Sequence, residues 1–356
     1  MDWIKGKLFG RQLSHGSENE APATFDEALN PQPPQQADVV QQVQMPDQLI
    51  SQVPPELNVY PCEKSTPGGK EMAAAYEISK QLVRERLARE NPEDLAILDG
   101  IKDTDIICVR GTYDHIHLVL EAIHIPFAHV NPEAILRMDL KPDQTVYVNC
   151  PSSFPPEVAH KLAKFVEGGG LLITTDWALQ HVIEVGFPNT VKYSGTATGD
   201  EVVSVEIVDK EDDTLKGFLD QEKDAAPVWW LESSSYPIEV LDKRRVKVLV
   251  RSDDLKKRYK HDPVIVRFEW GKGTVYHMIS HFYLQRSETR TKKQSASASS
   301  YASAQMVSEE TVSKFKEYEA YTPGLSYGMV QSAATSSEFV SRCVVKQKKK
   351  ATSFGK

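Results

Sequence analysis

The sequence predicts a doubly wound α/β domain, in which helices cover both faces of a mostly parallel sheet. Three observations indicate this class: a helix, a glycine stop and an apolar strand within residues 155–176, a strand–helix alternation that starts near residue 105, and strands with continuous apolar runs. Strands buried on both faces lose the polar alternation of half-exposed strands. Alternating strands and helices in turn favour parallel pairing with right-handed crossovers.

Residues 155–176 carry the clearest local pattern. Val158 and Leu162 belong to an apolar set that recurs every three to four residues, as in a helix that buries one face. We expect Gly168 to end this helix in a left-handed conformation. The apolar run 171–173 then forms a buried strand.

Further elements follow from the same kind of pattern. A helix is expected at 70–90, ended by Asn91-Pro92, and another at 113–124. The expected strands lie at 105–109, 126–130, 145–149, 202–207, 228–231, 238–241 and 246–250, with a late hairpin of 264–270 and 274–280. The short strands after residue 200 indicate a β-rich insertion.

Composition divides the 356 residues into four parts. Residues 1–13 mix Trp and Phe with Lys and Arg, which suits a membrane interface. Residues 14–69 form a Pro/Gln-rich linker, 70–285 the α/β domain, and 286–356 a flexible basic Ser-rich tail, so that both ends are expected to be disordered.

The chain is expected to be cytoplasmic. No apolar run approaches the roughly 20 residues of a membrane span, and the first residues lack a secretory signal. The four cysteines lie far apart without metal-ligand spacing, which favours reduced thiols.

Charge is distributed unevenly. The whole chain carries −8, whereas the part from Arg286 onward carries +6 and the first 285 residues therefore −14. An acidic body argues against specific nucleic-acid binding. The basic tail is interpreted as solvated, with contact to acidic partners, RNA or anionic lipid as the alternative.

The element order over residues 105–285 resembles the class I glutamine amidotransferase-like fold, a flavodoxin-like doubly wound sheet. The resemblance is to its ThuA-like and β-galactosidase-middle-domain-like branches. The segments that carry it are DIICVRGTYDHIHLVLEAIHIPFAHV, TVYVNC, KFVEGGGLLITTD and VIVRFEWGKGTVYHMISHF. Because these motifs are structural, the resemblance implies a fold more than an activity.

The resemblance also implies where catalytic residues would stand. The nucleophilic cysteine of active members follows the strand after the glycine-rich helix end, where this chain has Asp176. A carboxylate cannot form the thioester. His281 occupies the position of the family's histidine, but Tyr283 stands where the orienting glutamate is expected. Glutaminase activity is therefore expected to be absent.

Ligands of open α/β sheets bind at the carboxyl ends of strands. We therefore expect a cleft lined by Arg110, Gly111, Thr112, Asn149, Ser152, Asp176 and His281. It either binds a small polar ligand or is a relic that the protein's own tail covers. Cys150 also ends a strand, and a helix start near it would lower its thiol pKa. A buried spectator cysteine is the favoured interpretation.

No metal or other cofactor is expected. His117, Glu121 and His124 have a helical spacing that can hold a metal ion. Because no further ligand is evident, a solvated stripe is the favoured interpretation.

Three functional hypotheses follow. The first is a non-catalytic amidotransferase-like module, a pseudoenzyme that binds a ligand or a protein partner. The second is a hydrolase or transferase that uses Cys150 or Asp176 with His281. The third is a membrane-peripheral adaptor that uses residues 1–11 and the basic tail.

Overall fold

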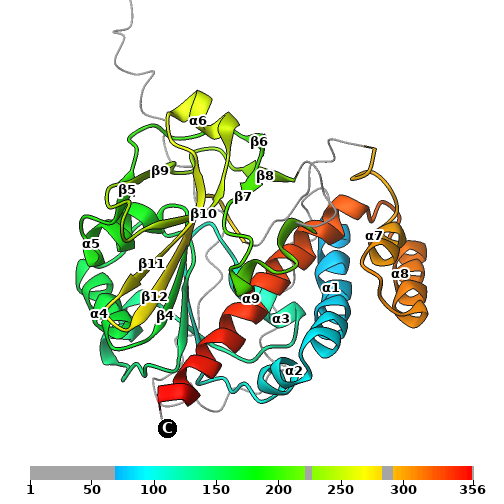
Figure 1. Cartoon of the computed structure of the whole chain (residues 1–356), viewed down its shortest axis with the longest axis horizontal. Coiled ribbons are helices and arrows are strands. Elements are labelled where there is room, and N and C mark those ends of the chain that lie inside the picture. Colours follow the sequence, from blue (N-terminus) through cyan, green and yellow to red (C-terminus); the bar gives the residue numbers. More distant parts are fainter. Residues whose placement is uncertain (1–68, 221–226, 283–291, 355–356) are drawn as a thin grey trace, which may run out of the picture. The chain divides into compact units, whose positions relative to one another are not determined.

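The computed structural model describes residues 69–220, 227–282 and 292–354. The described chain is built on an eight-stranded sheet of order β2-β1-β3-β4-β12-β11-β10-β7 (Figure 1). Its strands are β1 (Ile106–Val109), β2 (Ala128–Val130), β3 (Thr145–Val148), β4 (Leu171–Thr175), β7 (Glu206–Ile207), β10 (Lys247–Arg251), β11 (Pro263–Trp270) and β12 (Gly273–Met278). The neighbours from β2 to β12 pair in parallel, and the remaining pairs are antiparallel.

Helices cover both faces of this sheet, which confirms the predicted doubly wound α/β fold. Alternate strand residues belong to different cores, because successive side chains of a strand point to opposite faces. Ile106 packs in the core that contains α1 (Gly69–Glu90), α3 (Ile116–Ala122) and α9 (Tyr327–Phe354). Ile107 packs in the core that contains α4 (Pro156–Glu167). Figure 1 shows α4 and α9 on opposite sides of the strands.

The end of α4 differs from the prediction by one residue. Gly168 keeps a right-handed conformation, with φ −71°, and Gly169 adopts φ +128°. The chain therefore reverses at the second glycine of the run before β4 begins.

The β-rich insertion lies between β4 and β10. β5 (Val191–Tyr193) pairs with β9 (Ile238–Val240), and β6 (Glu201–Ser204) pairs with β8 (Val228–Leu231), both antiparallel. The remaining helical elements are α2 (Pro92–Asp99), η3 (Pro132–Arg137), the π-helical η4 (Leu179–Ile183), α5 (Glu184–Gly186), η5 (Asp213–Leu215), η6 (Phe218–Asp220), α6 (Asp253–Tyr259), α7 (Ala298–Ala304) and α8 (Glu309–Tyr321).

The expectation of a flexible tail from residue 286 is wrong for its described part. α9 is buried over most of its length, and its residues belong to the same core as α1. The serine-rich composition misled the prediction, because a buried helix can satisfy serine hydroxyls internally. Ser332, Ser336 and Ser337 each donate to the carbonyl four residues earlier, at 2.9, 3.2 and 2.8 Å.

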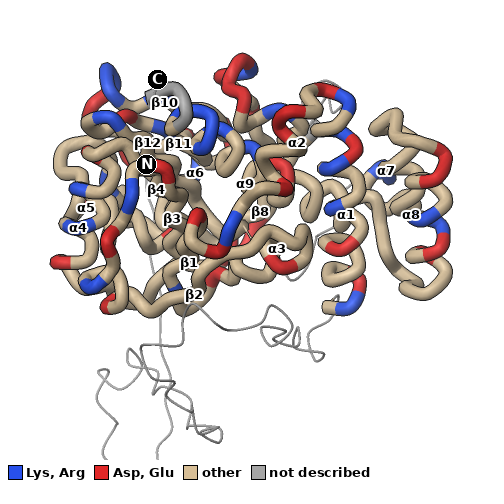
Figure 2. The backbone as a smooth tube through the Cα atoms, turned by 90° about the horizontal axis from the view of Figure 1, so that it is seen from below, with Lys and Arg blue, Asp and Glu red and all other residues tan. Residues whose placement is uncertain are grey.

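The basic run near the end of α9 contacts the acidic body of the domain. Lys348 binds Asp105 at 2.7 Å and Asp143 at 3.0 Å, and Lys346 lies 3.4 Å from Asp212. Acidic and basic positions are interspersed along α1 and α8 in Figure 2. The charges of these two lysines are therefore used within the domain, which weakens the expectation of a solvated basic tail.

The predicted N-terminal segment and linker lie outside the described residues, and so does Tyr283. In the part of the chain that the structure describes, no helix combines the length and the apolar content needed to span a bilayer.

Candidate functional site

Three neighbouring strands bring Cys150, Asp176 and His281 together. β3, β4 and β12 pair in parallel, so their carboxyl ends meet at one edge of the sheet. Cys150 follows β3, Asp176 follows β4 and His281 follows β12. Their sulfur, carboxylate and imidazole atoms lie within 4.8 Å of one another, and all three side chains are buried. The strand order therefore assembles residues that are far apart in the sequence.

Asp176 occupies a sharp turn at the end of β4. Its φ is +45°, a left-handed conformation that is uncommon for residues other than glycine. Its carboxylate accepts hydrogen bonds from Ser235 Oγ at 2.9 Å and from the Tyr236 amide at 2.8 Å. Burial raises the pKa of Asp176 to about 6, against the opposing effect of His281 and these hydrogen bonds. The side chain is thus ionised above that pH and held on both oxygens.

His281 is held between two carboxylates. Its Nδ1 lies 2.5 Å from Glu232 Oε2, and its Nε2 lies 3.6 Å from Asp176 Oδ2. Burial lowers the pKa of His281, but its interactions with Cys150, Glu232 and Asp114 outweigh burial, and the pKa lies well above its ordinary value. The thiol and the carboxylates around His281 therefore favour its protonated, imidazolium form.

Glu232 is the residue of this site that the sequence did not reveal. It follows β8 in the β-rich insertion, and its amide donates to Ser280 Oγ at 3.3 Å. In the family that the sequence resembles, the orienting carboxylate stands two residues after the histidine. The carboxylate that contacts His281 in this chain instead belongs to Glu232, from a different segment. Nothing in the sequence links Glu232 to His281, because the contact depends on how the insertion folds over the sheet edge.

Cys150 is a buried thiol beside the imidazolium. Its exposed fraction is 1%, and burial raises its thiol pKa despite the opposing effect of His281. Its carbonyl accepts hydrogen bonds from the amides of Thr112 and Tyr113 at 2.8 and 3.2 Å. A Cβ on Gly111 would lie 2.5 Å from this carbonyl, so glycine is required for the close approach. The thiol sits in a rigid, closed surrounding that does not favour a thiolate.

The other predicted ligand-binding residues have mainly structural contacts. Thr112 and Ser152 bond to each other through their hydroxyls at 2.8 Å. Asn149 accepts from the Ile116 amide at 3.0 Å and so fixes the start of α3. Arg110 is exposed at the end of β1. Of the predicted set, the structure brings together Asp176 and His281.

Four aromatic side chains surround the Asp176 turn; we call them the aromatic group. Trp177 stacks on Tyr236 at 5.3 Å, Tyr236 stacks on Tyr193 at 3.9 Å, and Tyr113 meets Trp177 edge to face at 5.1 Å. Tyr113 is 48% exposed and the other three are partly exposed. The aromatic group thus forms a partly exposed surface beside the buried cluster.

The buried cluster is suited to proton transfer and anion stabilisation more than to metal binding. Cys150, Asp176 and His281 offer one ligand atom each. In its protonated form, which its neighbours favour, His281 has no lone pair for a metal ion, whereas each Asp176 oxygen keeps a lone pair beside the one hydrogen bond that it accepts. An imidazolium beside a thiol can move a proton, provided that a substrate reaches it.

Comparisons with known proteins show only remote likeness. No protein family and no curated protein matches the sequence. A cytoplasmic protein from Salmonella typhimurium aligns at 10% identity over 61% of this chain and 98% of its own, with a TM-score of 0.35. A protein from Bacteroides uniformis described as ThuA-like aligns at 10% identity over 49% and 80%, with a TM-score of 0.34. A β-galactosidase from Bacillus circulans aligns at 16% identity over 54% and 31%, with a TM-score of 0.33. Likeness at this level carries no argument about family or activity.

Proposed function

We propose that this chain is a non-catalytic, amidotransferase-like binding module. The observation that carries the proposal is the state of Asp176. It stands at the sharp turn where a nucleophile would stand, is 3% exposed, and uses both carboxylate oxygens to hold the backbone and side chain of the insertion. Because its carboxylate connects the end of β4 to the insertion, we assign Asp176 a structural role and not a catalytic one.

The aromatic group is the surface that would receive a ligand. Its rings offer flat apolar contact, and the Glu232 side chain, 27% exposed, offers a carboxylate acceptor beside it. His281 Nδ1 lies 2.5 Å from one oxygen of Glu232 and holds that side chain in place. This chemistry suits a small polar ligand with one apolar face and hydrogen-bond donors.

Two measurements test the proposal. We expect no ammonia release from glutamine or simple amides by the unmutated protein. In a thermal-shift screen of small polar compounds, a ligand of this site should raise the Tm of the unmutated protein but not that of Trp177→Ala. Tyr321→Ala is the matched control, since Tyr321 is an aromatic residue 87% exposed on α8. A compound that stabilises all three proteins equally would place binding elsewhere.

A thiol hydrolase is the second candidate. The specific observation that favours it is the complete set of thiol, imidazole and orienting carboxylate formed by Cys150, His281 and Glu232. Turnover that Cys150→Ser and His281→Ala both abolish would establish this function and overturn the binding module. The buried thiol and its raised pKa argue against it.

The cytoplasmic location and membrane contact through residues 1–11 stay predictions from the sequence. Lysines of the basic run are paired within the domain, so the adaptor hypothesis rests on the first residues. Co-sedimentation with anionic liposomes tests it, and the double variant Trp3→Ala, Phe9→Ala should lose binding.

A further inference from the structure

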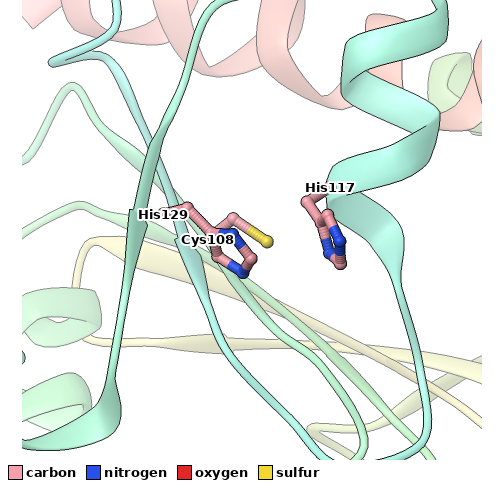
Figure 3. Close-up of side chains that lie close together, drawn as sticks. All are labelled: Cys108, His117 and His129. Atoms are coloured by element: carbon pink, nitrogen blue, oxygen red, sulfur yellow. The ribbon is translucent and has the colours of Figure 1, made fainter. Parts of the chain in front are cut away.

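A second cluster of metal-ligand side chains lies beside β2, the outermost of the parallel strands. β2 is the edge strand, and its pairing with β1 places His129 directly beside Cys108. Registered neighbours on adjacent parallel strands point to the same face of a sheet. His117 reaches this face from α3. Figure 3 shows the Cys108 sulfur pointing toward His117, with the His129 ring beside the thiol.

The three side chains converge closely. The Cys108 sulfur and one nitrogen from each of His117 and His129 all lie within 4.8 Å of one another. The two imidazole rings stack at 4.4 Å. Two strands and a helix fix the three ligand atoms, so the arrangement does not depend on a loop.

Packing alone does not account for this polar cluster. The same core consists otherwise of apolar residues such as Ile106, Val119 and Leu120. His129 Nε2 is buried and makes no hydrogen bond within the described residues. A buried polar atom without a partner destabilises the folded state, because it has lost its hydrogen bonds to water. A ligand that accepts the lone pair of this nitrogen would remove this destabilisation.

We propose that Cys108, His117 and His129 form a Zn²⁺ site. One thiolate and two imidazoles are ligands that zinc prefers, and zinc binds them at about 2.3 Å and 2.0–2.1 Å respectively. Tetrahedral geometry then needs ligand atoms roughly 3.4 Å apart, so inward shifts of about 1 Å or less would close the site.

The surroundings supply a second shell. Glu121 lies one helical turn after His117 on α3, and its carboxyl group influences Cys108 electrostatically, but it does not belong to the group of ligand atoms within 4.8 Å of one another. A water molecule would therefore be the fourth ligand of the ion. Asn149 Nδ2 donates to Cys108 Sγ at 3.5 Å, a contact that orients the sulfur.

Both positively charged and acidic side chains lie near Cys108, His117 and His129. Arg110 lies close enough to lower the pKa values of His117 and His129, although burial is the main cause in each case. Burial, with Asp114 and Glu121 adding to it, raises the pKa of the Cys108 thiol, and burial raises the pKa of Glu121 to about 7. A bound divalent ion would therefore have to displace the thiol proton, so its affinity should increase with pH.

The test uses the full chain, stripped with a chelator and then titrated with Zn²⁺ against a chromophoric competitor. We expect one ion per chain with a Kd below about 1 µM. Co²⁺ in place of Zn²⁺ should give a thiolate-to-cobalt charge-transfer band. Zn²⁺ should also raise the Tm of the stripped protein.

Variants locate the ion. Cys108→Ser and His129→Gln should each weaken binding beyond the roughly 10–100-fold that loss of an outer-shell partner costs, and Cys108→Ser should abolish the charge-transfer band. Cys343→Ser, which removes another buried thiol in α9, should leave the affinity unchanged. Circular dichroism before titration confirms that each variant is folded. If Cys108→Ser fails to fold, His129→Gln at the sheet edge still tests the site.

Three outcomes would overturn the site. The first is no binding by the unmutated protein tighter than micromolar. The second is equal affinity in the unmutated protein, Cys108→Ser and His129→Gln. The third is loss of the ion in Cys150→Ser with its retention in Cys108→Ser, which would move the metal to the Cys150, Asp176 and His281 cluster.

Discussion

Replacement of Glu338 by glutamine should destabilise the protein severely. Glu338 lies in α9 with no exposed surface, between Arg86 Nη1 at 3.1 Å and Arg342 Nε at 2.9 Å. Arg342 also contacts Glu90 at 2.8 Å. The side chains of both arginines are less than one-tenth exposed. Glu338 therefore neutralises two buried guanidinium groups that join α9 to α1.

The expected cost follows from burial. Glutamine preserves the shape of Glu338 but removes its charge, so Arg86 loses its carboxylate partner in a buried place and Arg342 keeps only Glu90. Removal of one partner from a buried ion pair costs about 3–5 kcal/mol. A domain is stable by roughly 5–15 kcal/mol in total. Glu338→Gln should thus remove a large share of the stability without leaving a cavity.

Urea denaturation followed by circular dichroism measures the effect. The matched control is Glu310→Gln, which breaks the exposed pair of Glu310 and Lys314 on α8 and should change stability by less than about 0.5 kcal/mol. A loss below about 1 kcal/mol for Glu338→Gln would refute the reasoning, because it would mean that α9 does not bury this charge against α1.

Three further results are expected. Asp176→Ala should lower stability by roughly 2–4 kcal/mol, because Ser235 Oγ and the Tyr236 amide lose their acceptor; a rise in stability in urea denaturation would instead mark Asp176 as a strained functional residue. Gly111→Ala should cost about 1–3 kcal/mol through overpacking against Cys150. Gly199→Ala should be close to neutral in the same assay, because a Cβ there would lie 3.9 Å from Tyr259 Oη. Burial lowers the pKa of His277 to about 3, so between about pH 6.5 and 3 only the unfolded chain binds this proton, and stability falls by about 1.4 kcal/mol per pH unit as pH decreases. His277→Gln should lose that part of the slope in unfolding curves at pH 6, 5 and 4, and an unchanged slope would contradict the buried neutral ring.

The fold could be predicted from local patterns because each pattern has a local cause. The period of Val158 and Leu162 identifies α4, and the apolar run that follows identifies β4. The hairpin of β11 and β12 turns at Gly271, where φ is +59°. These elements follow from residues next to them in the chain.

The site was predictable only in part. Asp176 and His281 were expected at strand ends, and the sheet order brings them together. Glu232 was missed, because a long insertion positions it. The pairing of Cys108 with His129 was missed for a similar reason, since the register of two strands is not encoded in spacing along one of them. His124, expected on the same helical stripe as His117, lies beyond the end of α3 with φ +57°.

The contact between α1 and α9 has a consequence for biosynthesis. Ser79 and Ser337, which bond through their hydroxyls at 2.9 Å, are separated by 258 positions. At about 5–20 residues per second, a ribosome needs roughly 13–50 seconds to make the intervening chain. The sheet is complete only after β12, which ends at Met278, and the face that α9 covers stays exposed until the residues from Tyr327 onward are made. A chain that stops before residue 327 would therefore expose this apolar face, and exposed hydrophobic surface of this kind makes folding intermediates prone to aggregation.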